Sequence, residues 1–144
     1  MKLTHRELVE MACVWLRRQG CVVVMPEPRN MGNIEIPDAI GWTYGSQSIL
    51  VECKASRTDF KADAKKRHRE FGMGSLRYFL APKGLIHPNE VPPGWGLVEP
   101  QGSRFRVVIP ARARDPYLKG EMNLLIAEFR SDTPSRCVAS RDSE

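Results

Sequence analysis

Two short motifs bring together residue types that can hold a metal ion and activate water. Pro37-Asp38 is followed, after thirteen intervening residues, by Glu52-Cys53-Lys54. A hard cation such as Mg²⁺ takes oxygen ligands, and one or two carboxylates suffice because waters and a substrate phosphate complete its coordination. A nearby lysine can orient or deprotonate the attacking water, or offset negative charge on the phosphate. Asp38, Glu52 and Lys54 are therefore candidates for metal-dependent chemistry on a phosphodiester.

Two adjoining strands are expected to position these side chains. Residues 34–44 and 48–55 have the composition of strands and are separated by a short turn that contains glycine, so they predict a β-hairpin. Because side chains alternate along a strand, Glu52 and Lys54 leave the same face. Pro37 cannot donate a hydrogen bond to the ladder, which predicts a bend or a break where the first carboxylate is presented.

Both motifs also have an ordinary interpretation. An aspartate after a proline, such as Asp38, can be a simple turn residue. Glu52 and Lys54 can be a charged pattern on an exposed edge strand. The apolar run at residues 49–51 argues against a fully solvated strand.

The other segments alternate between helices and strands. Thr4 and Glu7 form a capping-box pattern that begins a helix over residues 5–19, and Gly20 ends it. A helix over residues 59–71 separates two strands, which predicts a parallel pair joined by a right-handed crossover. Further strands are expected at 21–25, 76–81, 95–99 and 105–109, with a last helix at 121–129.

Composition limits the class of protein. The 144 residues suit one domain, expected over residues 1–130, followed by a polar tail at 131–144 that we expect to be disordered. The net charge of +5 suits a polyanionic partner, but many soluble proteins carry as much. Four cysteines without a CxxC pair predict buried thiols in a reducing compartment. Without an apolar leader or a spanning segment, we expect a cytoplasmic protein with no membrane partner.

A group of basic residues surrounds the predicted helix at 59–71. These residues most simply form a solvated helix face. In a nucleic-acid-binding protein the same side chains would contact the phosphate backbone. Both interpretations stay open for Arg57, Lys61, Lys65, Lys66 and Arg69.

The two motifs and the order of the elements resemble the PD-(D/E)XK nuclease superfamily. The similarity covers residues 4–81, with Pro37-Asp38 on one strand and Glu52-Cys53-Lys54 on the next. It implies a restriction-endonuclease-like α/β core, a mixed central β-sheet flanked by helices in the order αβββαβ. Further segments are similar to small stand-alone bacterial and phage members, such as MmcB-like predicted DNA-repair proteins, and extend the likeness to residue 99: residues 56–60, Asp63, Lys65 or Lys66, Arg77-Tyr78-Phe79 and Gly94-Trp95-Gly96-Leu97.

The resemblance implies a role for each residue of the two motifs. Asp38 and Glu52 would ligate Mg²⁺ or Mn²⁺, with the backbone carbonyl of Cys53 as a third ligand from the protein. Lys54 would assist the water nucleophile and stabilise the charge that develops at phosphorus.

Many members of the superfamily add a glutamate from the first helix. Glu7 flanks the core-facing side of the predicted helix, whereas Glu10 lies nearly opposite its apolar stripe. Glu7 is therefore our candidate for a fourth catalytic residue. Its role in the capping box explains its presence equally well.

The activity implied by the resemblance is that of a metal-dependent deoxyribonuclease, of endonuclease type. Its substrate would be duplex or branched DNA in repair, recombination or phage DNA processing, and two strands to cut would suit a homodimer. One alternative is a noncatalytic nucleic-acid-binding module of the same fold. Another is a nuclease subunit that needs a partner. The intact Lys54 favours the enzyme, because a binding module has no need of it.

Overall fold

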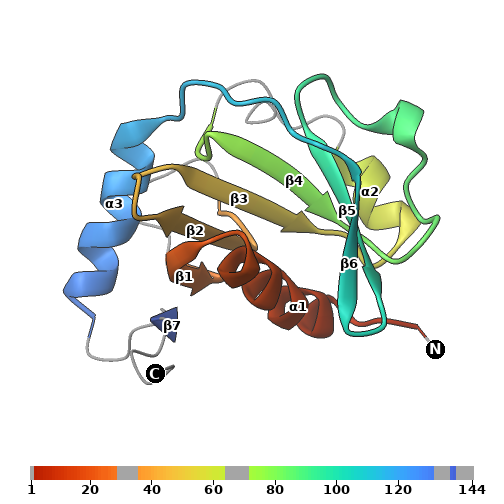
Figure 1. The fold of residues 1–144 in the computed structure, drawn as a ribbon, viewed down its shortest axis with the longest axis horizontal. Helices are drawn as coiled ribbons and strands as arrows, with labels where there is room; N and C mark the ends of the chain where they lie inside the picture. The colour runs from red at the N-terminus through yellow and green to blue at the C-terminus, as the bar shows by residue number, and fades with distance from the viewer. Residues whose placement is uncertain (1, 29–35, 64–71, 132–136, 139–144) are drawn as a thin grey trace.

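A mixed β-sheet with helices on both faces forms the molecule (Figure 1). The computed structural model describes residues 2–28, 36–63, 72–131 and 137–138. Seven strands lie in the order β6-β5-β4-β3-β2-β1-β7. The elements are α1 (His5–Arg18), β1 (Cys21–Pro26), β2 (Ala39–Thr43), β3 (Ser48–Cys53), α2 (Arg57–Asp63), β4 (Leu76–Leu80), the 3₁₀-helix η2 (Pro88–Glu90), β5 (Gly96–Gln101), β6 (Arg104–Ile109), α3 (Leu118–Phe129) and β7 (Cys137–Val138).

The strand pairing confirms the predicted hairpin and the predicted crossover. β2 and β3 are antiparallel, with Ala39 opposite Val51. β3 and β4 are parallel, with Cys53 beside Leu80, and β5 continues the parallel set. β3, β4 and β5 therefore end at the same edge of the sheet.

Two segments differ from their predicted boundaries. The helix expected at 59–71 begins earlier, at Arg57, and its residues 64–71 lie outside the described part of the chain. The expectation of a disordered tail is wrong for Cys137–Val138, because these residues pair with Val23 and Val24. The physical reason is that β1 would otherwise be an open edge, which readily accepts another strand.

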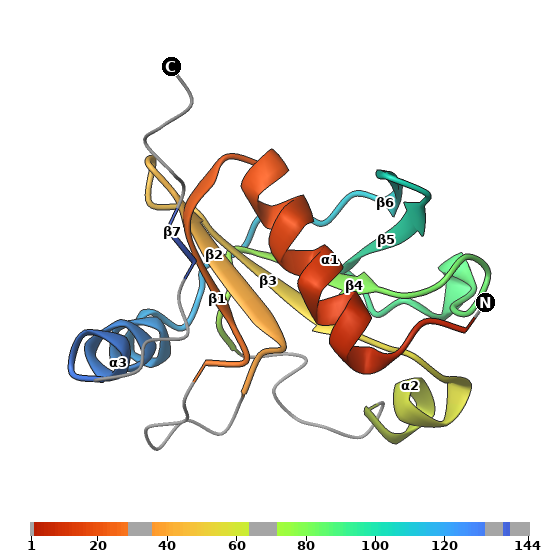
Figure 2. The ribbon, with the colours of Figure 1, turned by 90° about the horizontal axis from the view of Figure 1, so that it is seen from below.

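The core has two layers, one on each face of the sheet. α1 covers one face, where its buried Leu8, Ala12 and Leu16 pack against Val51. α2 and α3 cover the other face, with Leu50 in that layer (Figure 2). All six residues of β3 are buried, as expected for a strand covered on both sides. No helix in the described part of the chain is both long and apolar enough to cross a membrane.

A buried carboxylate fastens α3 to the sheet. Glu121 is 4% exposed, and its Oε1 accepts a hydrogen bond from Trp42 Nε1 at 3.0 Å. Its Oε2 accepts from Ser48 Oγ at 2.8 Å and from the Gly74 amide at 2.9 Å. Three donors from three segments thus converge on one side chain. A buried charge is tolerated when it is hydrogen-bonded in this way.

We expect Glu121→Ala to lower the free energy of unfolding by roughly 3 kcal/mol or more, because three donors lose their acceptor and each buried unsatisfied group costs about 1–3 kcal/mol. Glu121→Gln keeps one acceptor oxygen and should lose less. Urea unfolding measures both. The matched control is Met122→Ala, since the Met122 side chain is 56% exposed. A loss for Glu121→Ala as small as that of the control would contradict the anchoring role.

Candidate active site

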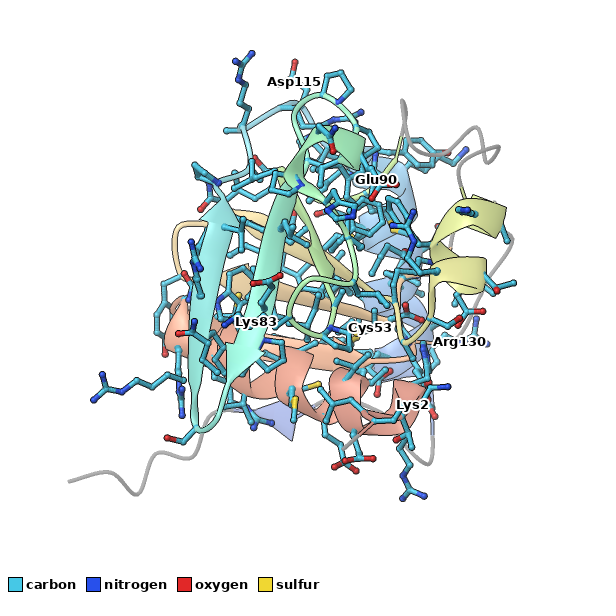
Figure 3. All side chains as sticks on the ribbon, turned by 90° about the vertical axis from the view of Figure 1, so that its right-hand side faces the viewer. Lys2, Cys53, Lys83, Glu90, Asp115 and Arg130 are labelled. Carbon is cyan, nitrogen blue, oxygen red and sulfur yellow. The ribbon has the colours of Figure 1, made fainter. Side chains whose placement is uncertain are left out.

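The carboxylate of Asp38 is fixed by the strand that carries the second motif. The backbone amide of Cys53 donates a hydrogen bond of 2.7 Å to Asp38 Oδ2. Asp38 directly precedes β2, and its carbonyl accepts a bond of 2.8 Å from the Glu27 amide after β1. Pro37 supplies no donor, so pairing gives way there to the turn that presents the carboxylate. Figure 3 views this end of the sheet, with Cys53 near the centre.

Asp38 and Glu52 form a carboxyl pair. Ala39 lies opposite Val51, so the preceding Asp38 comes beside Glu52, and the Glu52 side chain is close enough to influence the pKa of Asp38. The Asp38 side chain is 20% exposed and Glu52 6%. The pair is therefore shielded from water on most sides and open on one.

Burial raises the pKa of Asp38 above its ordinary value of 3.8. The Cys53 amide, the charges of His5 and Lys54, and the neighbouring Glu52 side chain oppose this rise but do not cancel it. Ionised Asp38 is thus stabilised too little by its neighbours to offset its desolvation. A bound cation would supply the missing positive charge.

Lys54 completes the group that the sequence predicted. It is 8% exposed, and its amide donates a bond of 3.0 Å to the Leu80 carbonyl, which extends the pairing of β3 with β4. Alternation puts Leu50, Glu52 and Lys54 on the face of β3 that is turned away from α1. The structure therefore brings Asp38, Glu52 and Lys54 together.

A further side chain that the sequence did not identify, His5, reaches Asp38 and also contacts Glu27. His5 Nε2 lies 3.4 Å from Asp38 Oδ1 and 3.6 Å from Glu27 Oε1. Glu27 has a φ of 42°, a left-handed conformation that is uncommon outside glycine. His5 is the first residue of α1, and Glu27 lies between two prolines. Neither position could be recognised from the sequence as part of the site, because the contact depends on how α1 docks on the sheet.

Glu7 takes the capping-box role. Thr4 Oγ1 accepts a bond of 3.1 Å from the Glu7 amide, and Glu7 Oε1 accepts from Thr4 Oγ1 at 2.9 Å. Glu10 is exposed and lies 3.7 Å from Arg6. The residue of α1 that contacts Asp38 is therefore His5, and our choice of Glu7 is not supported by the geometry.

Arg57 is engaged with the loop before β5. Its guanidinium forms two bonds to Glu90, of 2.7 and 2.8 Å, and a third of 3.0 Å to the Leu85 carbonyl. The bonds from Arg57 hold the pKa of Glu90 at about 2. Arg57 therefore ties α2 to this loop. Lys61 is exposed on α2, whereas Lys65, Lys66 and Arg69 lie outside the described residues.

The donor set of the site suits a hard cation. Asp38 and Glu52 supply oxygen, and burial raises the pKa of the Cys53 thiol well above its ordinary value, so Cys53 can offer only its carbonyl. No cluster of three or more His, Cys, Asp or Glu side chains with a metal-binding arrangement occurs among the described residues. Two carboxylates and a carbonyl are enough for Mg²⁺ or Mn²⁺, which keep waters in their coordination sphere.

The raised pKa of Asp38 predicts how stability depends on pH. A native state that holds the proton more tightly than the unfolded chain loses stability as pH rises through the native pKa, and the full cost is present above it. Without metal, Asp38→Asn should therefore gain stability relative to the parent as pH rises above the ordinary aspartate pKa of 3.8. Urea unfolding in EDTA measures the gain, with Asp115→Asn, an exposed position, as the control. Parallel pH curves for Asp38→Asn and the parent would contradict it.

The fold is similar to that of a solved structure. No protein-family model and no curated protein matches the chain. A protein of unknown function from Silicibacter pomeroyi is 22% identical, with a TM-score of 0.67 over 88% of this chain and 85% of that chain. At this identity the similarity establishes a shared mixed α/β fold alone.

Proposed function

We propose that the protein is a metal-dependent nuclease that hydrolyses phosphodiester bonds in DNA. One observation carries the proposal: two neighbouring carboxyl groups, Asp38 and Glu52, lie with Lys54 at the end of a buried strand. Three ionisable groups in such a setting are costly to the fold. Their presence is explained if they bind a cation and act on a phosphate.

The order of the elements supports a restriction-endonuclease-like core. α1, β1, β2, β3, α2 and β4 follow one another as the PD-(D/E)XK resemblance implies. The first motif precedes β2 and the second ends β3, with a parallel crossover next. This arrangement is the one on which the assignment of roles to Asp38, Glu52 and Lys54 depends.

Asp38 and Glu52 would hold Mg²⁺ or Mn²⁺, with the Cys53 carbonyl as a third ligand. A cation of this kind lowers the pKa of water and polarises the phosphate. Lys54 would accept a proton from the attacking water or donate a hydrogen bond to a phosphate oxygen, and its low exposure strengthens either interaction. His5, 3.4 Å from Asp38 Oδ1, would act as a positioning residue that sets the direction of this carboxylate.

A cleavage panel tests the proposal. Purified protein should cut at least one of single-stranded, duplex, flap or four-way-junction DNA when Mg²⁺ or Mn²⁺ is added, and EDTA should abolish the cutting. Lys54→Ala and Glu52→Gln should each lower the rate about 100-fold or more, because each removes a group that acts in the transition state.

The controls replace a lysine and a glutamate outside the candidate active site. Lys119→Ala and Glu10→Gln alter exposed residues and should cut like the parent. No cleavage of any substrate with either metal would contradict the proposal. So would Lys54→Ala that cuts as fast as the parent.

A further inference from the structure

A lysine sits at the edge of the sheet one strand away from the candidate active site. β4 lies beside β3, and after Leu80 the chain makes a tight turn in which the Leu85 amide bonds to the Pro82 carbonyl at 3.0 Å. Gly84 has a φ of 76°, which this turn requires and glycine adopts without strain. Lys83, beside it, is exposed (Figure 3).

The turn that carries Lys83 is anchored to β5. The Gly84 amide donates a bond of 2.8 Å to Glu99 Oε2, and Glu99 is 6% exposed. A bond to a buried carboxylate is stronger than one between neutral groups. The backbone under Lys83 is therefore held in place while its side chain remains in solvent.

Two arginines of β6 lie on the same face of the sheet as Lys54. Phe105 packs in the core layer of α1, so its neighbours Arg104 and Arg106 point to the opposite face, which is that of Glu52 and Lys54. Val98 of β5 lies beside Leu80 of β4. Arg104 pairs with Gln101, which is three residues further along β5 than Val98. Arg104 therefore extends past the end of β3 on the side of the site.

These cations lack an acidic partner in the described part of the chain. No carboxylate there lies within ion-pair distance of Lys83, Arg104 or Arg106. Glu99 lies opposite Arg106 and offsets part of its charge. Lys83 and Arg104 are thus exposed cations without an ion pair to a described carboxylate.

Protection of an open edge strand explains arginines on β6, since charges there discourage pairing with another chain. Protection of an edge strand does not explain Lys83, because Lys83 lies in the turn after β4, and β4 is paired on both sides. A shared function accounts for both positions. Three strand spacings, from β3 to β6, are about 14 Å, which corresponds to about four phosphates along one strand of duplex DNA.

We propose that Lys83 and Arg104 bind two separate phosphates of the DNA strand that enters the active site. The strand would cross the ends of β3, β4 and β5 and leave over the β5–β6 hairpin. The inference takes DNA as the ligand from the proposed function. It adds the path that the DNA strand would follow across the sheet. It also places the contacts on the side of the site opposite α2.

Binding of a fluorescent DNA duplex, measured by anisotropy in EDTA, tests this surface apart from catalysis. Lys83→Glu and Arg104→Glu should each weaken binding about tenfold at about 50 mM salt, and lower the slope of log affinity against log salt by about 1. Lys83→Gln and Arg104→Gln should show smaller losses in the same order. Both side chains are exposed, and thermal unfolding shows whether each variant is folded.

Lys119→Glu and Arg112→Glu are the matched controls. Both residues are exposed and belong to the opposite end of the sheet, where the Arg114 and Tyr117 amides bond to the Ser75 and Gly72 carbonyls ahead of β4. Their effect on affinity should stay below about twofold, since charges far beyond a Debye length of about 10 Å are screened.

The outcomes separate this inference from the nuclease proposal. Equal losses for all four charge reversals, or no loss at Lys83 and Arg104, would overturn the surface even if the protein cuts DNA. A parent that binds no DNA would overturn it as well. Losses confined to Lys83 and Arg104 support it, even in a protein that cuts nothing, in which case only the nuclease proposal fails.

Discussion

The bond from the Cys53 amide to Asp38 Oδ2, 2.7 Å long, is the contact on which the candidate site depends. It joins the residue before β2 to the last residue of β3, so the two motifs cannot move apart without breaking the end of the hairpin. Because Asp38 is held there, its carboxyl group comes beside Glu52. The bond thus supports the position that the hairpin register gives to the Asp38 carboxyl group.

The rest of the fold serves to keep that end of β3 in place. β3 is buried on both faces, by α1 on one side and by α2 and α3 on the other. At the far end of the sheet, Glu121 links α3 to Ser48, the first residue of β3. At the near end, Arg57 and Glu90 tie α2 to the loop that precedes β5. Contacts at both ends of the sheet thus hold the elements around β3, and Glu52 lies at the end opposite Ser48.

Much of this arrangement follows from local sequence patterns. The capping box of Thr4 and Glu7, the hairpin and the parallel crossover each depend on residues close in sequence or on a single topological rule. Alternation along β3 placed Glu52 and Lys54 on one face. The pairing of Asp38 with Glu52 then followed from the register of the hairpin.

Other parts depend on contacts that no local pattern encodes. His5 meets Asp38 because of the angle at which α1 crosses the sheet, and Arg57 finds Glu90 thirty-three residues away in an irregular loop. The left-handed backbone of Glu27 is imposed by its surroundings, since an isolated glutamate disfavours it. The geometry lends no support to Glu7 as a site residue, because helical angles locate a side chain around its helix but not relative to the sheet.

Calorimetric titration with Mn²⁺ tests the central claim most directly, that Asp38 and Glu52 form a cation site. We predict saturable binding to the parent with release of a proton, because the raised pKa of Asp38 favours its protonated form; the release is seen as a dependence of the heat on the ionisation enthalpy of the buffer. Asp38→Asn should lose this binding, while Asp115→Asn should retain it. Binding of equal strength to the parent and to Asp38→Asn, or no binding to the parent, would contradict the account.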